Sequence, residues 1–287
     1  MASNTSSSSQ EALNALGQRL RELRLDAGLS GRDLSRLTGW PPSKVSKIEN
    51  GRQAPSTEDV RQWCFHCRVP EQIPDFITSL RAVEGMFVEW RRMERTGLKQ
   101  ALESTVPLHE KTKRFRTYNA WLIPGILQTA DYTKAVLSTI AGRRGVPDDS
   151  DEAVKVRLKR QQLTRMGDHR FAVIVEESVL YSSILSPELM YRQLEYVVDM
   201  SALQRVSLGV IPRSADRSSM WAVESFWIYD EDRVTVELVS GFLNLTRTHE
   251  VRMYAQAFAA LSAIALHGPP ARDLVLAAAR TYRDLLR

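Results

Sequence analysis

The sequence predicts an all-α head of about five helices followed by an α+β domain. Residues 11–80 carry apolar residues at helical spacing, in short stretches separated by glycine and proline. Runs of β-branched and aromatic residues, which are typical of strands, appear only after Pro107. The chain of 287 residues is also longer than one usual domain. We therefore expect a disordered tail at residues 1–10, the head at 11–80, a helical linker at 81–106 and the second domain at 107–287.

The first three helices of the head are predicted from spacing and caps. Apolar residues at helical spacing predict the first helix, which ends at Gly28: Leu13, Leu16, Leu20, Leu23 and Ala27. Two short helices follow around a turn at Gly39, with these inward positions: Leu34, Leu37, Val45 and Ile48. Ser30 is a good N-cap with Asp33 three residues later, and Pro41-Pro42 can begin a helix but cannot continue one. Gly51 is expected to end the third helix.

A fourth helix and at least one further helix are predicted after Gly51. Pro55-Ser56-Thr57-Glu58 has the composition of a turn and a cap, and it predicts a fourth helix that carries Val60, Trp63, Cys64 and Cys67. Residues from Phe76 to about Leu102 predict one or two more helices, which Gly85 and Gly97 break or bend.

The segment from Gly31 to Asn50 has the spacing of a helix-turn-helix unit. Together with the upstream Leu-Arg-Glu-Leu-Arg and Gly-Leu-Ser, and with Pro55 downstream, residues 11–80 resemble the Cro/CI (XRE) type of DNA-binding domain. The resemblance implies that double-stranded operator DNA is a partner and that the helix at about 42–50 enters the major groove. Gly31 departs from the family, because many relatives carry a glutamine there that holds the DNA backbone. The neighbouring Arg32 is expected to take over that contact.

Candidate DNA contacts follow from the faces of these helices. Because Val45 and Ile48 turn inward, the outward positions are expected to reach base edges: Ser43, Lys44, Ser46 and Lys47. The flanking positions are expected to hold phosphates: Ser30, Arg32, Arg52 and Gln53. One head offers few contacts, and relatives in this class bind as dimers on half-sites about 34 Å apart. We therefore expect a homodimer, joined through the second domain or the helices after Phe76.

The second domain is predicted to mix strands and helices. Strands are expected at residues 171–176, 206–211, 225–229 and 233–239, with a further strand near 114–118. Helices are expected at residues 130–137, 151–166, 187–203, 248–266 and 270–286.

A second resemblance covers about residues 107–285. It rests on Ile123-Pro-Gly-Ile-Leu-Gln-Thr-Ala-Asp-Tyr, on Arg157 with Arg160-Gln161, on Val175-Glu-Glu-Ser-Val-Leu and on a long helix before the end. This pattern resembles the domain that follows an XRE head in the WhiJ-like, antitoxin-like group of actinomycete regulators. The resemblance implies a transcriptional regulator that often works with a small separate partner protein.

Two features of the second domain have alternative interpretations. Pro124-Gly125, followed by Gln128 and Thr129, predicts a helix start that either binds an anion or packs on the sheet. Four aromatic residues either line a pocket for a small-molecule effector or belong to the core: Trp221, Phe226, Trp227 and Tyr229. Packing is the favoured interpretation in both cases.

Other residue patterns do not point to catalysis, to a cofactor or to a metal. The histidines are dispersed, and no phosphate loop, zinc motif or nucleophile elbow occurs, so we expect no enzyme. Cys64 and Cys67 flank His66, but no second ligand pair exists at matched spacing. We expect both thiols to be small buried side chains.

Charge and hydropathy indicate a cytoplasmic protein without a membrane span. No secretory signal is visible, and the longest nearly apolar stretch, residues 254–266, is too short to cross a bilayer. The net charge is +5, and its positive excess falls in residues 81–170, with 18 basic against 11 acidic residues. That segment either touches phosphates beside the head or is a solvated or partner-facing surface, and we favour the surface.

The sequence thus predicts a sequence-specific DNA-binding transcriptional regulator whose second domain dimerises or receives a signal. One alternative is an antitoxin-like module that binds a small partner protein and uses DNA binding for autoregulation. Another is a sensor gated by a small molecule in residues 107–287. The operator, the direction of regulation, the dimer interface and the effector are not readable from the sequence.

Overall fold

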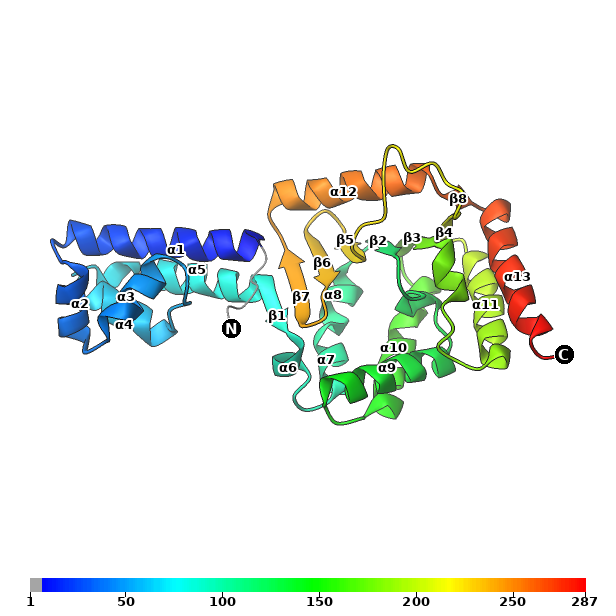
Figure 1. Cartoon of the computed structure of the whole chain (residues 1–287), viewed down its shortest axis with the longest axis horizontal. Helices are drawn as coiled ribbons and strands as arrows, with labels where there is room; N and C mark the ends of the chain where they lie inside the picture. Colours follow the sequence, from blue (N-terminus) through cyan, green and yellow to red (C-terminus); the bar gives the residue numbers. More distant parts are fainter. Residues whose placement is uncertain (1–6) are drawn as a thin grey trace. The chain divides into compact units, whose positions relative to one another are not determined.

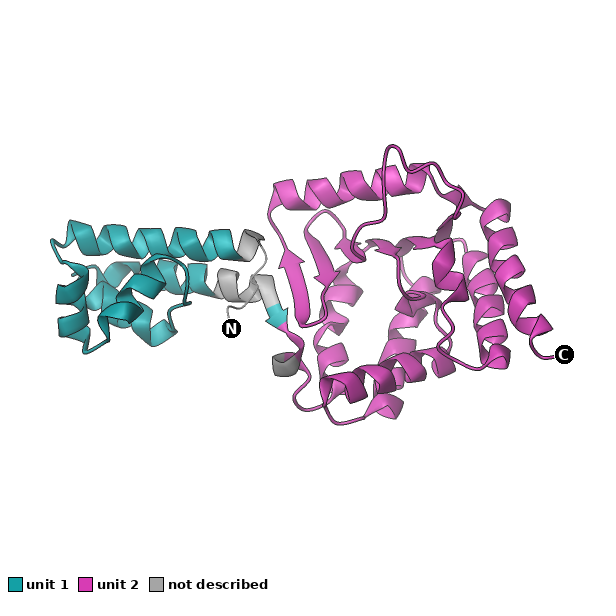
Figure 2. Cartoon of the chain, in the orientation of Figure 1, with its two compact units in different colours: residues 1–88 teal, residues 89–287 magenta. Residues whose placement is uncertain are grey.

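The computed structural model describes the backbone of residues 7–287 and the side chains of residues 10–80, 88–90 and 93–287. The chain divides into two compact units, residues 1–88 and 89–287 (Figure 2). Unit 1 is helical and unit 2 combines a sheet with helices (Figure 1). The predicted fold class, a helical head followed by an α+β domain, is confirmed.

Unit 1 is built from α1 (Ser7–Asp26), α2 (Gly31–Thr38), α3 (Pro42–Glu49), α4 (Thr57–His66), the 3-10 helix η1 (Pro70–Gln72) and α5 (Ile73–Met86). The expected tail at residues 1–10 needs a correction, because α1 already begins at Ser7. Gln10 Nε2 donates to the Gly51 carbonyl oxygen over 2.8 Å and so fixes this early part of α1 to the end of α3. Residues 1–6 lie outside the described residues.

The core of unit 1 joins all five helices. It is formed by Leu16, Leu20, Leu34, Val45, Ile48, Val60, Trp63, Cys64, Cys67, Phe76 and Leu80. Trp63 Nε1 donates to the Leu20 carbonyl oxygen over 2.9 Å, so this buried indole is satisfied. The prediction for Leu37 is wrong, since its side chain is 49% exposed. The short α2 turns Leu34 and Ser35 inward, which leaves Leu37 on its outer face.

Gly17 lies where α1 packs against the end of α3. A Cβ atom on Gly17 would be 2.4 Å from the carbonyl oxygen of Ile48 and 2.8 Å from that of Glu49. Both are backbone atoms, so no side-chain rotation can relieve the clash. The close approach of the two helices therefore requires glycine at this position.

Replacing Gly17 by alanine is expected to destabilise unit 1 by about 2 kcal/mol. Alanine favours the helix by about 1 kcal/mol, but over-packing against backbone costs about 3 kcal/mol. Hydrogen–deuterium exchange of α1 and α3 in the full chain measures the change. Gly142→Ala in α9 is the matched control, because its Cβ would meet nothing within 4 Å and should stabilise its helix. Equal protection in Gly17→Ala and the natural chain would contradict the close approach.

The strands of unit 2 form one mixed sheet. They are β2 (Arg114–Asn119), β3 (Arg170–Glu176), β4 (Val206–Ile211), β5 (Phe226–Tyr229), β6 (Arg233–Glu237), β7 (Gly241–Leu245) and β8 (Leu266–His267). Their order is β7-β6-β5-β2-β3-β4-β8. β2, β3 and β4 are parallel, with Phe115 opposite Phe171, while the other neighbouring pairs in this order are antiparallel. The predicted strands are confirmed, and β7 and β8 are strands that the sequence did not indicate.

Helices cover both faces of this sheet (Figure 1). They are α9 (Ala130–Arg144), α10 (Ser150–Gln161), α11 (Pro187–Ser201), α12 (Thr248–Ala263) and α13 (Pro269–Asp284), with the 3-10 helices η2 (Gly125–Leu127), η3 (Gln162–Thr164) and η4 (Glu177–Tyr181). Residues of α9, α11 and α13 share a core with one face, and residues of α12 share a second core with the other. The predicted helices are confirmed in position, although α9 runs on to Arg144.

The expected linker at residues 81–106 is not a separate segment. α5 continues to Met86, and the strand β1 (Phe87–Glu89) spans the boundary between the units. α6 (Trp90–Met93), α7 (Leu98–Ser104) and α8 (Val106–Lys111) belong to unit 2. The Asp149 carboxylate accepts from the amides of Leu98 and Lys99 over 2.8 and 3.0 Å, and this capping contact fixes α7 to unit 2. The side chains of Val83 and Phe87 lie outside the described residues, and Gly85 lies within α5 and does not end it.

Candidate nucleic-acid interface

α2 and α3 form the predicted helix-turn-helix. Ser30 Oγ accepts from the Asp33 amide over 3.1 Å and the Asp33 carboxylate accepts from the Ser30 amide over 3.0 Å, which completes a capping box at the start of α2. Ser30 Oγ also donates to Asp33 Oδ2 over 2.5 Å, and this bond together with the one from the Ser30 amide holds the pKa of Asp33 below its ordinary value. Gly39 adopts a left-handed conformation with φ of 72° and turns the chain toward α3.

The outer face of α3 carries three of the four residues expected to read bases. Val45 and Ile48 are buried, and Ser43, Ser46 and Lys47 are exposed. Pro42 opens the helix at its first position, as predicted. An exposed hydroxyl pair and one exposed ammonium along a single eight-residue helix can donate to base edges in a major groove.

Lys44, the fourth residue expected to read bases, contacts protein side chains and is not exposed on the outer face of α3 like the other three. Its Nζ lies 2.6 Å from Asp59 Oδ1 in α4 and 4.3 Å from the centre of the Trp40 ring. Burial alone would raise the pKa of Asp59, but hydrogen bonds from Lys44 and Ser56 hold that pKa below 3.8. Lys44 therefore joins α3 to the capped start of α4, and its role as a base contact stays a prediction.

Replacing Lys44 by alanine is expected to destabilise unit 1 by about 1 kcal/mol at neutral pH. The lowered pKa of Asp59 gives stabilisation that is complete above 3.8 and is lost as pH falls through the lower folded pKa. Without Lys44 the effect of burial remains and one of the bonds that lower the pKa is gone, so the folded pKa of Asp59 should shift upward and the variant should lose less stability on acidification than the natural chain. Urea unfolding of the full chain between pH 3 and pH 7, values chosen to bracket the ordinary carboxyl pKa of about 4, measures this shift. Lys47→Ala is the matched control and should unfold like the natural chain.

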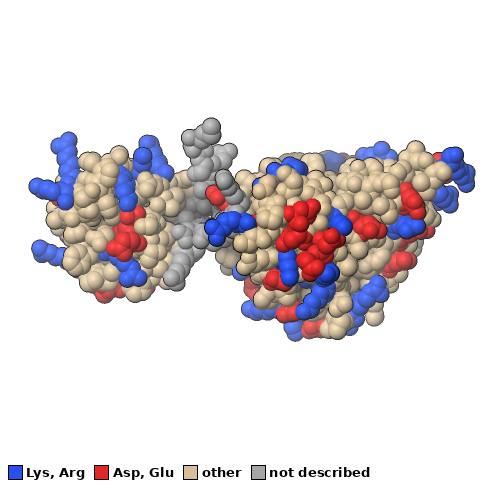
Figure 3. All heavy atoms as spheres, turned by 90° about the horizontal axis from the view of Figure 1, so that it is seen from below, with Lys and Arg blue, Asp and Glu red and all other residues tan. Residues whose placement is uncertain are grey.

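The flanking residues lie around the two helices as expected, with one qualification. Arg32, Arg52 and Gln53 are exposed, and the amides of Arg52 and Gln53 close the end of α3 on the Lys47 carbonyl oxygen over 2.8 and 3.2 Å. The Ser30 hydroxyl is occupied by the capping box. On the face of unit 1 shown in Figure 3, Lys and Arg project separately around the rim, with acidic residues between them.

A buried ion pair that sequence reasoning missed holds α3 in place. Arg24 Nε and Nη2 donate to the two oxygens of Glu49 over 2.6 and 3.0 Å, and Nη1 donates to the Leu29 carbonyl oxygen over 2.6 Å. Arg24 and Glu49 are each less than 10% exposed as whole residues. The contact joins the end of α1, the start of the α2 segment and the end of α3. A signal existed, because Arg24 follows Leu20 by four residues on the apolar stripe of α1.

The cysteine pair is buried as expected. Cys64 and Cys67 lie in the core of unit 1, where burial raises the pKa of each thiol to about 11. Both are therefore protonated at neutral pH. Within the described residues, no group of three or more His, Cys, Asp or Glu side chains has the arrangement of a metal site.

The aromatic residues suggested for a pocket belong mainly to the core of unit 2. Phe226 and Tyr229 are buried on β5, and Trp227 packs partly buried beside them, whereas Trp221 is exposed. Gln193 Oε1 accepts from the Thr129 amide over 2.7 Å, so the segment after Pro124-Gly125 is held by protein contacts. The favoured packing interpretation is confirmed for Phe226 and Tyr229.

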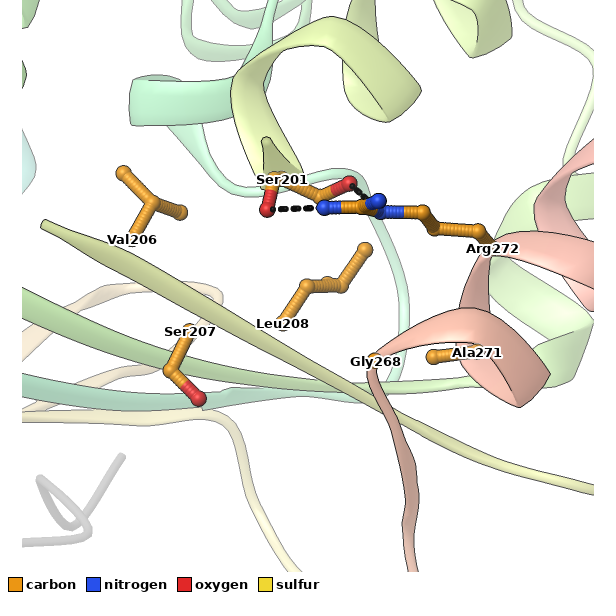
Figure 4. A pocket seen from close by; sticks show the side chains of 7 residues that line it. All are labelled: Ser201, Val206, Ser207, Leu208, Gly268, Ala271 and Arg272. Carbon is orange, nitrogen blue, oxygen red and sulfur yellow. Dashed lines mark hydrogen bonds between the residues drawn. The ribbon is translucent and has the colours of Figure 1, made fainter. Parts of the chain in front are cut away.

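A cavity at the start of α13 has a volume of about 180 Å³ (Figure 4). Its lining consists of Ser201, Val206, Ser207, Leu208, Gly268, Ala271 and Arg272. Arg272 reaches across it and donates to the hydroxyl and the carbonyl oxygen of Ser201, each over 3.1 Å. Small-molecule sites occupy about 300–1,000 Å³. This cavity is smaller, and its arginine already has partners.

The helix pair, with the capped start of α2 and the exposed outer face of α3, has the arrangement of an XRE-type helix-turn-helix unit. A family model described as a helix-turn-helix domain matches residues 15–73, and a model described as a domain of unknown function (DUF5753) matches residues 102–276. The second match covers more than half of the chain, which therefore belongs to the DUF5753 family. The chain is an XRE-type DNA-binding regulator with this domain after its head.

Two other comparisons add little. No protein with a curated description matches the chain. Among solved structures, the archaeal chromatin protein TrmBL2, whose title reports a novel mode of DNA binding, is 11% identical over 84% of this chain and 88% of its own, with a TM-score of 0.32. That score is too low to support a common fold. None of the helices in the described part of the chain combines the length and the hydropathy that a bilayer span needs.

Proposed function

We propose that the protein regulates transcription by placing α3 in the major groove of an operator. The observation that carries this proposal is the exposed row of Ser43, Ser46 and Lys47 on a helix whose opposite face is fixed to α1 and α4. Arg32, Arg52 and Gln53 would hold phosphates beside it, and Lys44 would act mainly by fixing α3 to α4. The protein would act in the cytoplasm, where the operator is accessible.

Operator recognition would need two copies of the chain. Three exposed side chains on α3 provide at most about 3–9 kcal/mol of discrimination together, and two of them are serines that do not make the bidentate contacts at the top of this range, whereas a specific site is preferred by about 4–10 kcal/mol. We propose a homodimer on two half-sites about 34 Å apart. Selection from random DNA duplexes with the full chain tests both points. Enrichment of a two-fold repeat with that spacing supports the proposal, and enrichment of no motif opposes it.

The second candidate function of unit 2 is to bind a small partner protein. Trp121 and Trp221 are 71% and 68% exposed, which is unusual for this side chain. Trp121 follows β2 and Trp221 precedes β5, and these strands are antiparallel neighbours joined at this end by the Ala120 amide and Ser225 Oγ over 3.1 Å. Loss of regulation in cells by Trp121→Ser/Trp221→Ser, with DNA binding kept in vitro, would favour this function.

A further inference from the structure

Two sequence motifs of unit 2 that lie apart in the chain meet at α10. Gln161 Nε2 donates to the carbonyl oxygens of Gly125 and Gln128 over 2.9 and 2.6 Å. Arg157 Nη1 donates to Gln128 Oε1 over 3.2 Å. The Pro-Gly segment is thus fixed to the face of α10 that carries Arg157, Arg160 and Gln161. DNA binding by unit 1 does not use this contact.

The partners of the two arginines on this face are electrically neutral. Arg160 Nη1 donates to Thr105 Oγ1 over 3.1 Å, and Nη2 lies 2.7 Å from His109 Nε2. Arg157 has the amide oxygen of Gln128. Within the part of the chain that the structure describes, neither guanidinium makes an ion pair. Two like charges one helical turn apart therefore have no carboxylate in contact.

The His109 side chain is neutral, so it neither balances nor increases the positive charge of Arg157 and Arg160. Its Nδ1 lies 2.8 Å from the Thr105 carbonyl oxygen, so Nδ1 carries the proton and Nε2 accepts from Arg160. Burial, followed by the charge of Arg160, lowers the pKa of His109 to about 3. The imidazole is neutral at physiological pH and fixes the orientation of Arg160.

The surroundings make this arrangement costly. Burial lowers the pKa of Arg157, and burial together with the charge of Arg157 lowers the pKa of Arg160 to about 10. Both residues are nevertheless partly exposed, so neither side chain is fully enclosed in the core. Arg157 uses one of its five N–H donors on Gln128, and Arg160 uses one on Thr105 and one on His109. The remaining donors are available to a ligand.

Two other partly buried arginines of unit 2 have carboxylate partners. Arg144 pairs with Glu94 over 2.5 Å, and Arg217 pairs with Glu176. Glu237 acts on Arg157 and Arg160 only through space, from an exposed position on β6. Because a partly desolvated pair of cations needs a counter-charge, an external anion would relieve the cost that the protein leaves uncompensated.

We propose that Arg157 and Arg160 form a binding site for an oxyanion, the phosphate or carboxylate group of a small molecule. Guanidinium donors fit both groups in a bidentate manner. The rings of His109 and Tyr229, 5.6 Å apart between centres, would bound the site. A small molecule is favoured over an acidic side chain of a partner protein, since the guanidiniums are only partly accessible. The proposal concerns unit 2 alone and does not depend on DNA binding.

The test measures the Tm of the full chain against inorganic phosphate and against malonate, with NaCl keeping the ionic strength constant. A ligand at ten times its Kd should raise the Tm by about 3–6 °C for a domain of this size. Arg157→Gln should lose this response. It should also have an equal or higher Tm without anion, because it removes one of two repelling charges. Response to one anion and not the other identifies the group as phosphate or carboxylate.

Two controls separate this site from others. Arg192→Gln removes an exposed arginine that pairs with Glu188 and should respond like the natural chain. Arg272→Gln changes the cavity at α13, and it should also keep the response. If Arg157→Gln fails to fold, Arg160→Lys is the alternative variant. It keeps the positive charge but cannot bind an oxyanion in a bidentate manner, so it should need about tenfold more anion for the same rise in Tm. No response of the natural chain at about 100 mM of either anion, which is a hundred times a 1 mM Kd, would overturn the proposal. A response lost in Arg272→Gln alone would also overturn it.

Discussion

Glu49→Ala is expected to destabilise unit 1 by about 3–5 kcal/mol, the cost of leaving a buried charge without its partner. Arg24 would keep its bond to the Leu29 carbonyl oxygen but lose both bonds to the carboxylate. Because Glu49 lies in the last turn of α3, the loss should release α3 first. Hydrogen–deuterium exchange of residues 31–50 in the full chain should become at least about a hundredfold faster.

A double replacement separates the charge effect from a packing effect. Arg24→Met/Glu49→Leu removes both charges and fills similar volume, so it should recover most of the lost stability. Glu58→Ala is a matched control, since Glu58 is an exposed residue of α4 that accepts only from Gln62. If the double variant were as unstable as Glu49→Ala, the ion pair would not be the cause.

Lys47→Ala/Arg52→Ala is expected to weaken operator binding by about 10² to 10⁴, because each of the two side chains should contribute about 1–3 kcal/mol to the complex. Both side chains are exposed, and the capping bonds at this end of α3 come from the backbone. Unit 1 should therefore stay as stable as in the natural chain. The dissociation constant for the selected operator, measured by gel shift, gives the loss of affinity.

The salt dependence of the same variant identifies the kind of interaction. Removal of one phosphate-binding side chain should reduce the slope of log K against log salt by about 1, whereas removal of a base-reading side chain should relax selectivity at one position. Arg192→Ala, an exposed arginine of unit 2, is the control for general charge. Operator affinity unchanged in Lys47→Ala/Arg52→Ala would remove α3 from the interface.

Local features of unit 1 could be predicted because they depend on neighbouring residues. Ser30 with Asp33, Gly39 and Pro42 each act within a few positions, and all three have the predicted roles. The contacts of Lys44 with Asp59 and of Arg24 with Glu49 join residues 15 and 25 positions apart. Periodicity assigns residues to faces, but it does not say which charged side chain finds a partner across helices.

Contacts between distant residues also limited what the sequence could predict of unit 2. Its apolar strands were predicted from runs such as Phe171 to Glu176, whereas β7 is half-buried, begins with Gly241 and contains Asn244, so it gave no such run. The prediction of a separate linker was wrong because distant residues hold this segment to unit 2. For example, the Asp149 carboxylate accepts from the amides at the start of α7. The meeting of Arg157 and Gln128 depends on how α10 packs against η2, which no local pattern encodes.

The most direct measurement compares binding of the full chain to its own upstream region and to a scrambled duplex across a salt series. We expect salt-sensitive binding that prefers the natural sequence, and we expect Lys47→Ala/Arg52→Ala to lose this preference while its hydrogen exchange remains unchanged. Equal affinity for both duplexes, or a preference that survives in the variant, would contradict sequence reading by α3.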